Sequence, residues 1–303
     1  MTLPVAAIFA IGVWLQYGLV SKGLWPQLAC FIVSVYLLIE LSNHNALLRV
    51  RSRMVSSSFL ALSCTACFLF DSMTGAIVQL CTIISLMFLF QTYQNQQAAG
   101  RTFYAFLPVG VASLVFVQTL WFVPLLWVLM GTQLQSLSWR SWLASVIGLT
   151  TPYWFALLWL MMPFNIPEGG SIDLAPLAEH FAQLVSFQPI SLQSLSIGMI
   201  AVFVFTLVLA AIGTMHFWQY SFEDKIRIRL LYGFFITMTT FTLVFVMVQP
   251  QHYAVLMHIG FVCASPLIAH VLTFTNSRLS NIFFFVAISL VLVLTTYNLW
   301  MAS

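Results

Sequence analysis

Long apolar runs, separated by short polar segments, extend along almost the whole chain. They cover residues 3–20, 24–41, 56–70, 74–93, 103–130, 142–161, 191–213, 230–249, 253–272 and 282–300. A helix needs about 20 apolar residues, within a range of about 17–25, to cross the hydrocarbon core of a bilayer. The pattern therefore predicts an all-α, polytopic transmembrane helical bundle that forms a single integral membrane domain over residues 1–303.

The run at 103–130 is long enough to be one tilted helix or a hairpin that turns near Gln118. Pro108, Gln118 and Pro124 interrupt it. Cytoplasmic loops collect Lys and Arg, and the hairpin places nine of the ten basic residues on the side of Arg49, whereas a single span leaves four there. We therefore predict about 11 membrane segments, with a short or re-entrant pair at 103–133. The N-terminus is expected inside and the C-terminus outside.

Composition narrows the class of protein. The 303 residues are 61% hydrophobic and 6% charged, whereas soluble domains carry about 25% charged residues. These values exclude an ordinary soluble enzyme, and ten scattered basic residues do not form a nucleic-acid surface. The sequence has no P-loop, dinucleotide fingerprint or HExxH motif. We predict no catalytic residue, metal, cofactor or nucleic-acid partner, and an enzyme is the less favoured class.

The first predicted inner loop is the densest polar segment. Its candidate binding residues are Glu40, Asn43, His44, Arg49, Arg51 and Arg53. The three arginines alternate, so on an extended strand they would line one side and offer planar donors to phosphate or a lipid headgroup. Glu40 could hold one of them in place. The alternative is that the loop only fixes orientation by the positive-inside rule.

A second inner loop carries the basic residues Lys225, Arg227 and Arg229. Ser221 and Asp224 match a capping box, which predicts a helix that starts at Phe222. Lys225 and Arg229 are four residues apart and share a face of that helix. This loop is a further candidate for binding an anionic lipid or a partner, although a capped helix start with snorkelling side chains is the favoured explanation.

The longest predicted outer loop, 162–190, contains an amphipathic segment. Its apolar residues follow helical spacing, and they are Leu174, Leu177, Phe181 and Leu184. Asp173 can cap such a helix. We predict a helix that lies in the membrane interface. It could instead act as a lid over a cavity, in which case Gln118 and Phe181 would serve as gates.

His258 is the one ionisable residue that the runs place deep in the membrane. Such residues are functional candidates because they are costly unless paired. His270 follows twelve residues later, on another face and about 18 Å along the axis, so the two cannot share one site. A hydrogen bond within the bundle is the favoured explanation for His258.

Two segments carry a resemblance to a known group of proteins. Residues 43–54 read NHNALLRVRSRM after two spans and before a Ser-rich third, and WRSW at 139–142 precedes a helix with the letters IGLTTP. In these two segments and in the order of its spans, the chain resembles an uncharacterised family of polytopic inner-membrane proteins from Bacteroidota. That family has no established activity, so the resemblance implies a cell-envelope context and no catalytic residue.

Three functional hypotheses follow for a multi-pass protein of the bacterial cytoplasmic (inner) membrane. The first is a non-catalytic component of envelope assembly or export that docks another membrane protein or an anionic lipid through the two basic loops. The second is a transporter or flippase of an amphipathic or lipid-linked substrate. The third is a lipid-linked glycosyl transferase or polymerase, whose acid–base groups would come from the outer acids Asp71, Glu168, Asp173 and Glu179.

Overall fold

The computed structural model describes residues 2–50, 52–160, 175–186, 195–274 and 278–302, and all regular structure within these ranges is helical. The α-helices, in chain order, are α1 (Thr2–Tyr17), α2 (Trp25–Asn45), α3 (Met54–Thr65), α4 (Met73–Phe90), α5 (Ala99–Val115), α6 (Phe122–Thr132), α7 (Trp139–Leu160), α8 (Ala175–Val185), α9 (Ile197–Tyr220), α10 (Ile226–Val248), α11 (Tyr253–Phe274) and α12 (Arg278–Ala302). The same ranges also contain the short 3-10 helices η1 (Cys67–Asp71), η2 (Val117–Trp121), η5 (Ser221–Glu223) and η6 (Pro250–His252).

Seven helices in the described ranges are long and apolar enough to cross a membrane, and four shorter apolar helices accompany them. The expected all-helical architecture of a membrane bundle is confirmed in this respect. The number of crossings, which we predict to be 11, and the direction of the termini remain predictions.

Contacts between helices divide the chain into two compact units. Unit 1 combines Met1–Ile83 with Ile190–Ser303, and unit 2 is Ile84–Pro189. Unit 2 is therefore an insertion, in sequence, between the two parts of unit 1. The single domain expected over 1–303 remains a prediction, and each unit is described by itself below.

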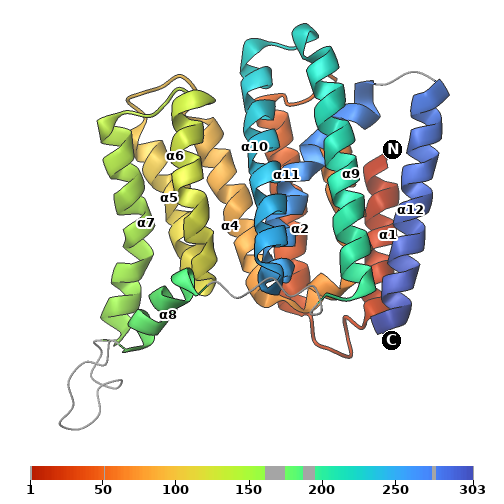
Figure 1. The fold of residues 1–303 in the computed structure, drawn as a ribbon, viewed down its shortest axis with the longest axis horizontal. Coiled ribbons are helices and arrows are strands. Elements are labelled where there is room, and N and C mark those ends of the chain that lie inside the picture. Colours follow the sequence, from red (N-terminus) through yellow and green to blue (C-terminus); the bar gives the residue numbers. More distant parts are fainter. Residues whose placement is uncertain (1, 51, 161–174, 187–194, 275–277, 303) are drawn as a thin grey trace. The chain divides into compact units, whose positions relative to one another are not determined.

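Helix α11 is the central element of unit 1. It is hydrophobic on all sides and continuously buried from Val255 to Val271, as expected for a helix with no face toward lipid or water. It packs against α3, α9 and α10. In Figure 1 the C-terminus lies at the lower edge of this unit, and the N-terminus lies higher, below the upper ends of α9 and α12.

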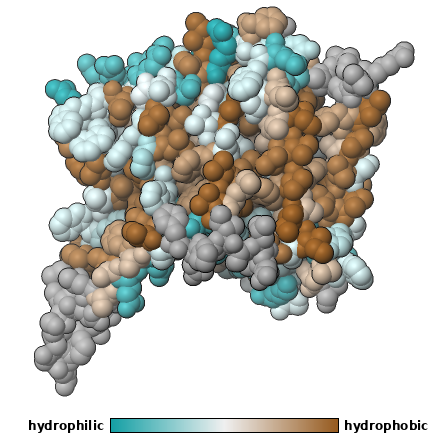
Figure 2. Space-filling view, in the orientation of Figure 1, coloured by the Kyte–Doolittle hydropathy of each residue, from teal (hydrophilic) through white to brown (hydrophobic). Residues whose placement is uncertain are grey.

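The outer helices of unit 1 carry the opposite pattern. Large apolar side chains on α9 and α12 are exposed, including Ile197, Val204, Phe285 and Val293. Figure 2 shows hydrophobic residues over these two helices. Such a surface fits the hydrocarbon of a membrane.

The predicted span at 56–70 is broken. Helix α3 has only 12 residues and ends at Thr65, and η1 turns the chain into α4. The freed carbonyl of Thr65 accepts a hydrogen bond of 2.7 Å from Asn298 Nδ2 on α12. The serines of its first turns, Ser56, Ser57 and Ser58, are buried, and small residues of this kind let membrane helices approach closely.

Unit 2 contains the segment whose path the sequence left open. Residues 103–133 form two helices, α5 and α6, joined by η2, in which Gln118 lies. Helix α7 packs closely along α5 because residue 148 is glycine: a Cβ atom there would lie 2.5 Å from the carbonyl oxygen of Phe103. Helix α8 agrees with the amphipathic helix expected in the loop 162–190, whereas Asp173 lies outside the described residues.

Candidate functional site

Asp224 is the buried centre of a polar cluster in unit 1. The expected capping box at Ser221 is wrong, because residues 221–223 form the 3-10 helix η5 and α10 begins only at Ile226. Asp224 has an extended backbone conformation between these helices. Its side chain turns inward and is 1% exposed, so it does not serve the helix terminus as predicted.

Arg49 is the ion-pair partner of Asp224. Its Nε donates to Asp224 Oδ1 at 2.6 Å, and its Nη2 lies 3.5 Å from the carbonyl oxygen of Tyr220. The guanidinium also lies over the ring of Phe274, 4.9 Å from the centroid. The chain reaches this position because Ala46, in the left-handed conformation, ends α2. The arginine is thus held by a carboxylate, an aromatic face and a carbonyl.

Two histidines extend the cluster away from Asp224. His270 Nε2 lies 3.4 Å from Asp224 Oδ2, and His270 Nδ1 lies 3.1 Å from His216 Nδ1. A carboxylate only accepts, so His270 donates from Nε2 and its Nδ1 accepts from His216. The rings of Phe217, Tyr232 and Phe274 surround His270. The result is a directed chain of hydrogen bonds from α9 through α11 to the α9–α10 loop.

Arg227 reaches a different partner. Its Nη2 donates to Asn45 Oδ1 at 2.9 Å, and Asn45 Nδ2 donates to the carbonyl of Leu41 at 3.0 Å. These bonds tie the start of α10 to the end of α2. Arg49 and Arg227, one from each predicted basic loop, therefore connect those loops to the same end of unit 1.

A polar pocket of about 230 Å³ lies where α2 passes into the following loop. Its lining residues are Ser42, Asn43, Ala46, Leu48, Arg49, Val50 and Ser52. Arg49 thus lines the pocket while Asp224 holds its Nε. Donors from Asn43, Arg49 and the serines suit an anionic group of phosphate size.

The other candidate residues of the two predicted inner loops lie mostly at the surface. Lys225, Arg229, Arg53, Asn43, His44 and Glu40 are exposed, and Arg51 lies outside the described residues. Arg49 and Arg53 do not share one side of an extended strand as expected, because Arg49 turns inward onto Asp224 whereas Arg53 immediately precedes α3 and faces outward. We name the exposed cations Arg53, Lys225 and Arg229, together with the pocket, the basic end.

The two predicted gate residues lie close to each other in unit 2. Gln118 Nε2 donates to the carbonyl of Gln183 on α8 at 2.8 Å. Phe181 stacks on Tyr153 of α7 with ring centroids 5.4 Å apart. His180 donates from Nε2 to the carbonyl of Ser113 at 2.9 Å. These contacts hold α8 against η2, α5 and α7.

An apolar pocket of about 350 Å³ lies beside α8, lined by Leu120, Leu149, Thr150, Tyr153, Trp154, Leu157, Leu177 and Phe181. Phe181 is thus part of its wall, while Gln118 holds the backbone of α8 from the side of η2.

The remaining candidates do not form a catalytic arrangement within the described ranges. Asp71 accepts from Tyr17 and lies 3.7 Å from Lys22 Nζ, Glu179 is exposed on α8, and Glu168 and Asp173 lie outside those ranges. His258 hydrogen-bonds Gln79, with His258 Nδ1 2.8 Å from Gln79 Oε1. It belongs to a separate cavity, away from the cluster of His270.

Comparisons with known proteins give no relative: no family model, curated protein or solved structure matches the chain. The resemblance to the Bacteroidota family therefore stays a prediction. His216 is not predicted as a site residue by any pattern in the sequence. Its spacing to His270 carries no motif, and only the packing of α9 on α11 brings the two rings together.

Proposed function

We propose that the protein is a non-catalytic, multi-pass component of a bacterial cytoplasmic-membrane assembly or export system that docks a phosphate-bearing lipid headgroup at the basic end. The observation that carries this proposal is the pocket of about 230 Å³ whose Arg49 is oriented by the buried Asp224. An arginine that serves only topology needs no carboxylate partner that is 1% exposed. A phosphate in the pocket would meet Arg49, which Asp224 already holds in place, and Lys225 directly follows Asp224 in the chain.

Binding of an anionic lipid tests this proposal. Each basic side chain near a membrane surface contributes about 1 kcal/mol toward an anionic headgroup. The double variant Lys225→Gln/Arg229→Gln is therefore expected to weaken retention of phosphatidylglycerol about 30-fold, as measured by titration in detergent with native mass spectrometry. Retention of phosphatidylethanolamine is expected to change little, and the preference is expected to fall as salt rises.

Arg140→Gln is the matched control, because Arg140 is an exposed arginine at the start of α7 in unit 2. It removes a positive charge without touching the basic end and is expected to leave lipid retention unchanged. Equal losses in both variants would show general charge attraction and contradict the proposal. A stoichiometric protein in place of lipid would show that the basic end docks a partner.

A second candidate function, transport of an amphipathic or lipid-linked substrate, is favoured by α8 and its pocket. Phe181, a residue of α8, stacks on Tyr153 at the apolar pocket, and the Gln118 side chain donates a hydrogen bond to the backbone of α8. Helix α8 is thus attached by a few polar bonds and one aromatic stack.

A cysteine introduced at Phe181 checks this second function. If α8 opens during transport, a candidate lipid-linked substrate is expected to change the rate of maleimide labelling at this position, because the side chain exchanges contact with Tyr153 for contact with the substrate. Leu143→Cys, exposed on α7, serves as the control and is expected to label at a constant rate. Constant labelling at both positions for every candidate substrate counts against transport through this pocket.

A further inference from the structure

Two buried histidines lie behind the pocket of the basic end. His270 on α11 is 0% exposed and His216 on α9 is 8% exposed, and neither lines the pocket. Burial of a polar side chain costs free energy unless its hydrogen bonds are made. The bonds of these two residues lead through the carboxylate of Asp224 to Arg49, which does line the pocket.

Asp224 gives each of its two carboxylate oxygens to a different partner. Oδ1 accepts from Arg49 Nε at 2.6 Å, and Oδ2 lies 3.4 Å from His270 Nε2. The two donors come from different parts of unit 1, the α2–α3 loop and α11, so together they set the plane of the carboxylate. Arginine and carboxylate groups frequently form bidentate pairs. Without the His270 donor, Oδ2 would be available to the same guanidinium, and Arg49 would turn from the pocket toward Asp224.

His216 fixes which nitrogen of His270 carries the proton. The Nδ1 atoms of the two rings are 3.1 Å apart, so one of them donates to the other. With His216 as the donor, His270 keeps its proton on Nε2, where the carboxylate of Asp224 accepts it. The reverse arrangement would place two acceptors, His270 Nε2 and Asp224 Oδ2, against each other. It would also bury a proton on His216 Nε2, which has no hydrogen-bond partner among the described residues.

Aromatic side chains hold the ring of His270 in place. The ring centroids of Tyr232 and Phe217 lie 5.1 and 5.4 Å from that of His270, and the centroid of Phe274 lies 4.8 Å from it. Phe274 also contacts the guanidinium of Arg49, which lies 4.9 Å from the ring centroid. One aromatic ring therefore contacts both the histidine and the arginine, so the position of His270 affects Arg49 through packing as well as through Asp224.

We propose that His270 is a positioning residue for anion binding at the basic end: its Nε2–H, in the tautomer that His216 fixes, holds the Asp224 carboxylate so that Arg49 faces the pocket. This inference rests on the proposed docking of a phosphate-bearing headgroup and adds to it two residues that do not line the pocket. A histidine that only stabilises the bundle would leave headgroup binding unchanged in every folded variant. A positioning histidine changes binding when its donor is lost, and another donor in its place restores binding.

Paired substitutions at His270 test the proposal, by titration of phosphatidylglycerol against the full-length protein in detergent with native mass spectrometry. Folded His270→Phe keeps a ring among the aromatic side chains but loses the donor. Its retention of the lipid is expected to fall about 10-fold, the factor for loss of one hydrogen bond to a charged group. His270→Gln is expected to retain the lipid almost as the wild type does, because its amide N–H can donate to Asp224 Oδ2. Unchanged retention in His270→Phe, or an equal loss in both variants, overturns the proposal.

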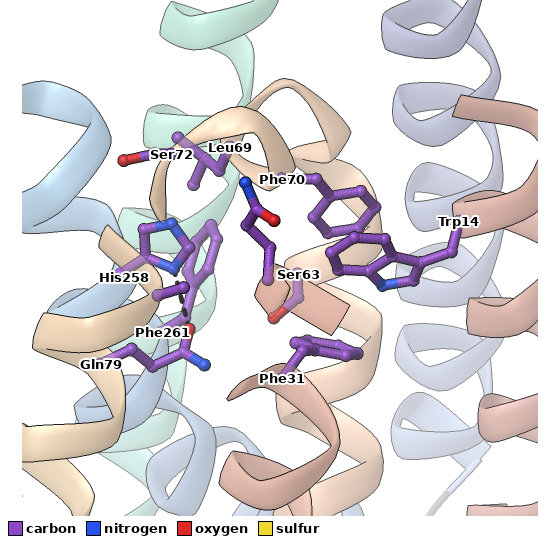
Figure 3. A pocket seen from close by; sticks show the side chains of 11 residues that line it. Trp14, Phe31, Ser63, Leu69, Phe70, Ser72, Gln79, His258 and Phe261 are labelled. Atoms are coloured by element: carbon purple, nitrogen blue, oxygen red, sulfur yellow. Dashed lines mark hydrogen bonds between the residues drawn. The ribbon is translucent and has the colours of Figure 1, made fainter. Parts of the chain in front are cut away.

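His258→Phe is the matched control. His258 is also a buried histidine of α11, but it lines a different cavity, where its Nδ1 lies 2.8 Å from Gln79 Oε1 (Figure 3). Retention of phosphatidylglycerol is expected to be unchanged in this variant. A loss equal to that of His270→Phe would show a general loosening of α11 and would overturn the proposal.

Solid-state NMR of the wild-type protein in lipid nanodiscs tests the same proposal without a variant. His270–Val271 is the one His–Val pair in the sequence, so carbonyl-13C, ring-15N histidine together with 15N-valine selects the signals of His270. We expect a protonated Nε2, an unprotonated Nδ1, and a shift of the Nε2 signal when phosphatidylglycerol replaces phosphatidylethanolamine. A proton on Nδ1, or an Nε2 signal that does not move while phosphatidylglycerol binds, overturns this inference alone. Wild-type protein that retains no phosphatidylglycerol contradicts the proposed function itself, and the inference with it.

Discussion

Replacement of Asp224 by alanine is expected to lower the free energy of unfolding by about 2–3 kcal/mol, because the buried N–H of His270 loses its acceptor and Arg49, whose side chain is 30% exposed, loses a charge-assisted hydrogen bond. Arg49 would lose the carboxylate that binds its Nε, and His270 would lose the acceptor of its Nε2 proton. The α2–α3 loop and the α9–α10 loop would lose their charged connection together. Reversible unfolding in mixed micelles measures the change.

Two further variants provide comparisons for the loss of unfolding free energy in Asp224→Ala. Asp224→Asn keeps the shape but not the charge, so it is expected to destabilise less than alanine. Lys22→Gln breaks the pair with Asp71, whose side chains are 39% and 52% exposed, and exposed pairs contribute less than about 1 kcal/mol. If Asp224→Ala costs no more than Lys22→Gln, the Asp224–Arg49 pair does not stabilise the basic end.

Gly75→Ala is expected to lower the free energy of unfolding by about 3 kcal/mol, through overpacking and a lost buried hydrogen bond. A Cβ atom at residue 75 would lie within van der Waals contact distance of the His258 ring, 2.6 Å from Nε2 and 3.0 Å from Ser72 Oγ. The imidazole would have to move away, and its bond to Gln79 would break. The same unfolding measurement applies.

Gly12→Ala is the control for this substitution. Gly12 lies in α1, and a Cβ atom there would meet no other atom within 4 Å. Alanine is the better helix former by about 0.5–1 kcal/mol, so this variant should be neutral or slightly more stable. A neutral Gly75→Ala variant would show that α4 and α11 can separate without cost and would contradict the close packing around His258.

The helices could be predicted from the sequence because membrane spans depend on one local property, the length of an apolar run. Polar residues predict the ends of most helices to within a few residues. Charge asymmetry favours a hairpin, and the structure places its turn in η2, around Gln118. The break after Thr65 was not visible. The letters Cys64 to Phe70 are apolar enough to continue a helix, and the contact that receives the Thr65 carbonyl comes from Asn298, 233 residues away.

The candidate site was predictable only in part. The two basic loops were found by composition, but the roles of single residues were not. Asp224 was interpreted as a helix-capping residue because Ser221 stands three positions before it, whereas the structure turns it inward to meet Arg49. That pair joins residues 175 positions apart, and so does not follow from any local pattern. His216 and the polar atoms around His258 depend equally on long-range packing.

The order in which the ribosome makes the chain gives the insertion of unit 2 a consequence for biogenesis. Residues 1–83 emerge first, yet their central partner α11 begins only at Tyr253. Unit 2 is synthesised in between and has all of its residues in one stretch, so it can fold while α3 still presents Ser56, Ser57 and Ser58 without α11 beside them. The N-terminal helices must therefore stay in the membrane without the packing that α11 provides. The packing of unit 1 is completed only when translation is almost complete.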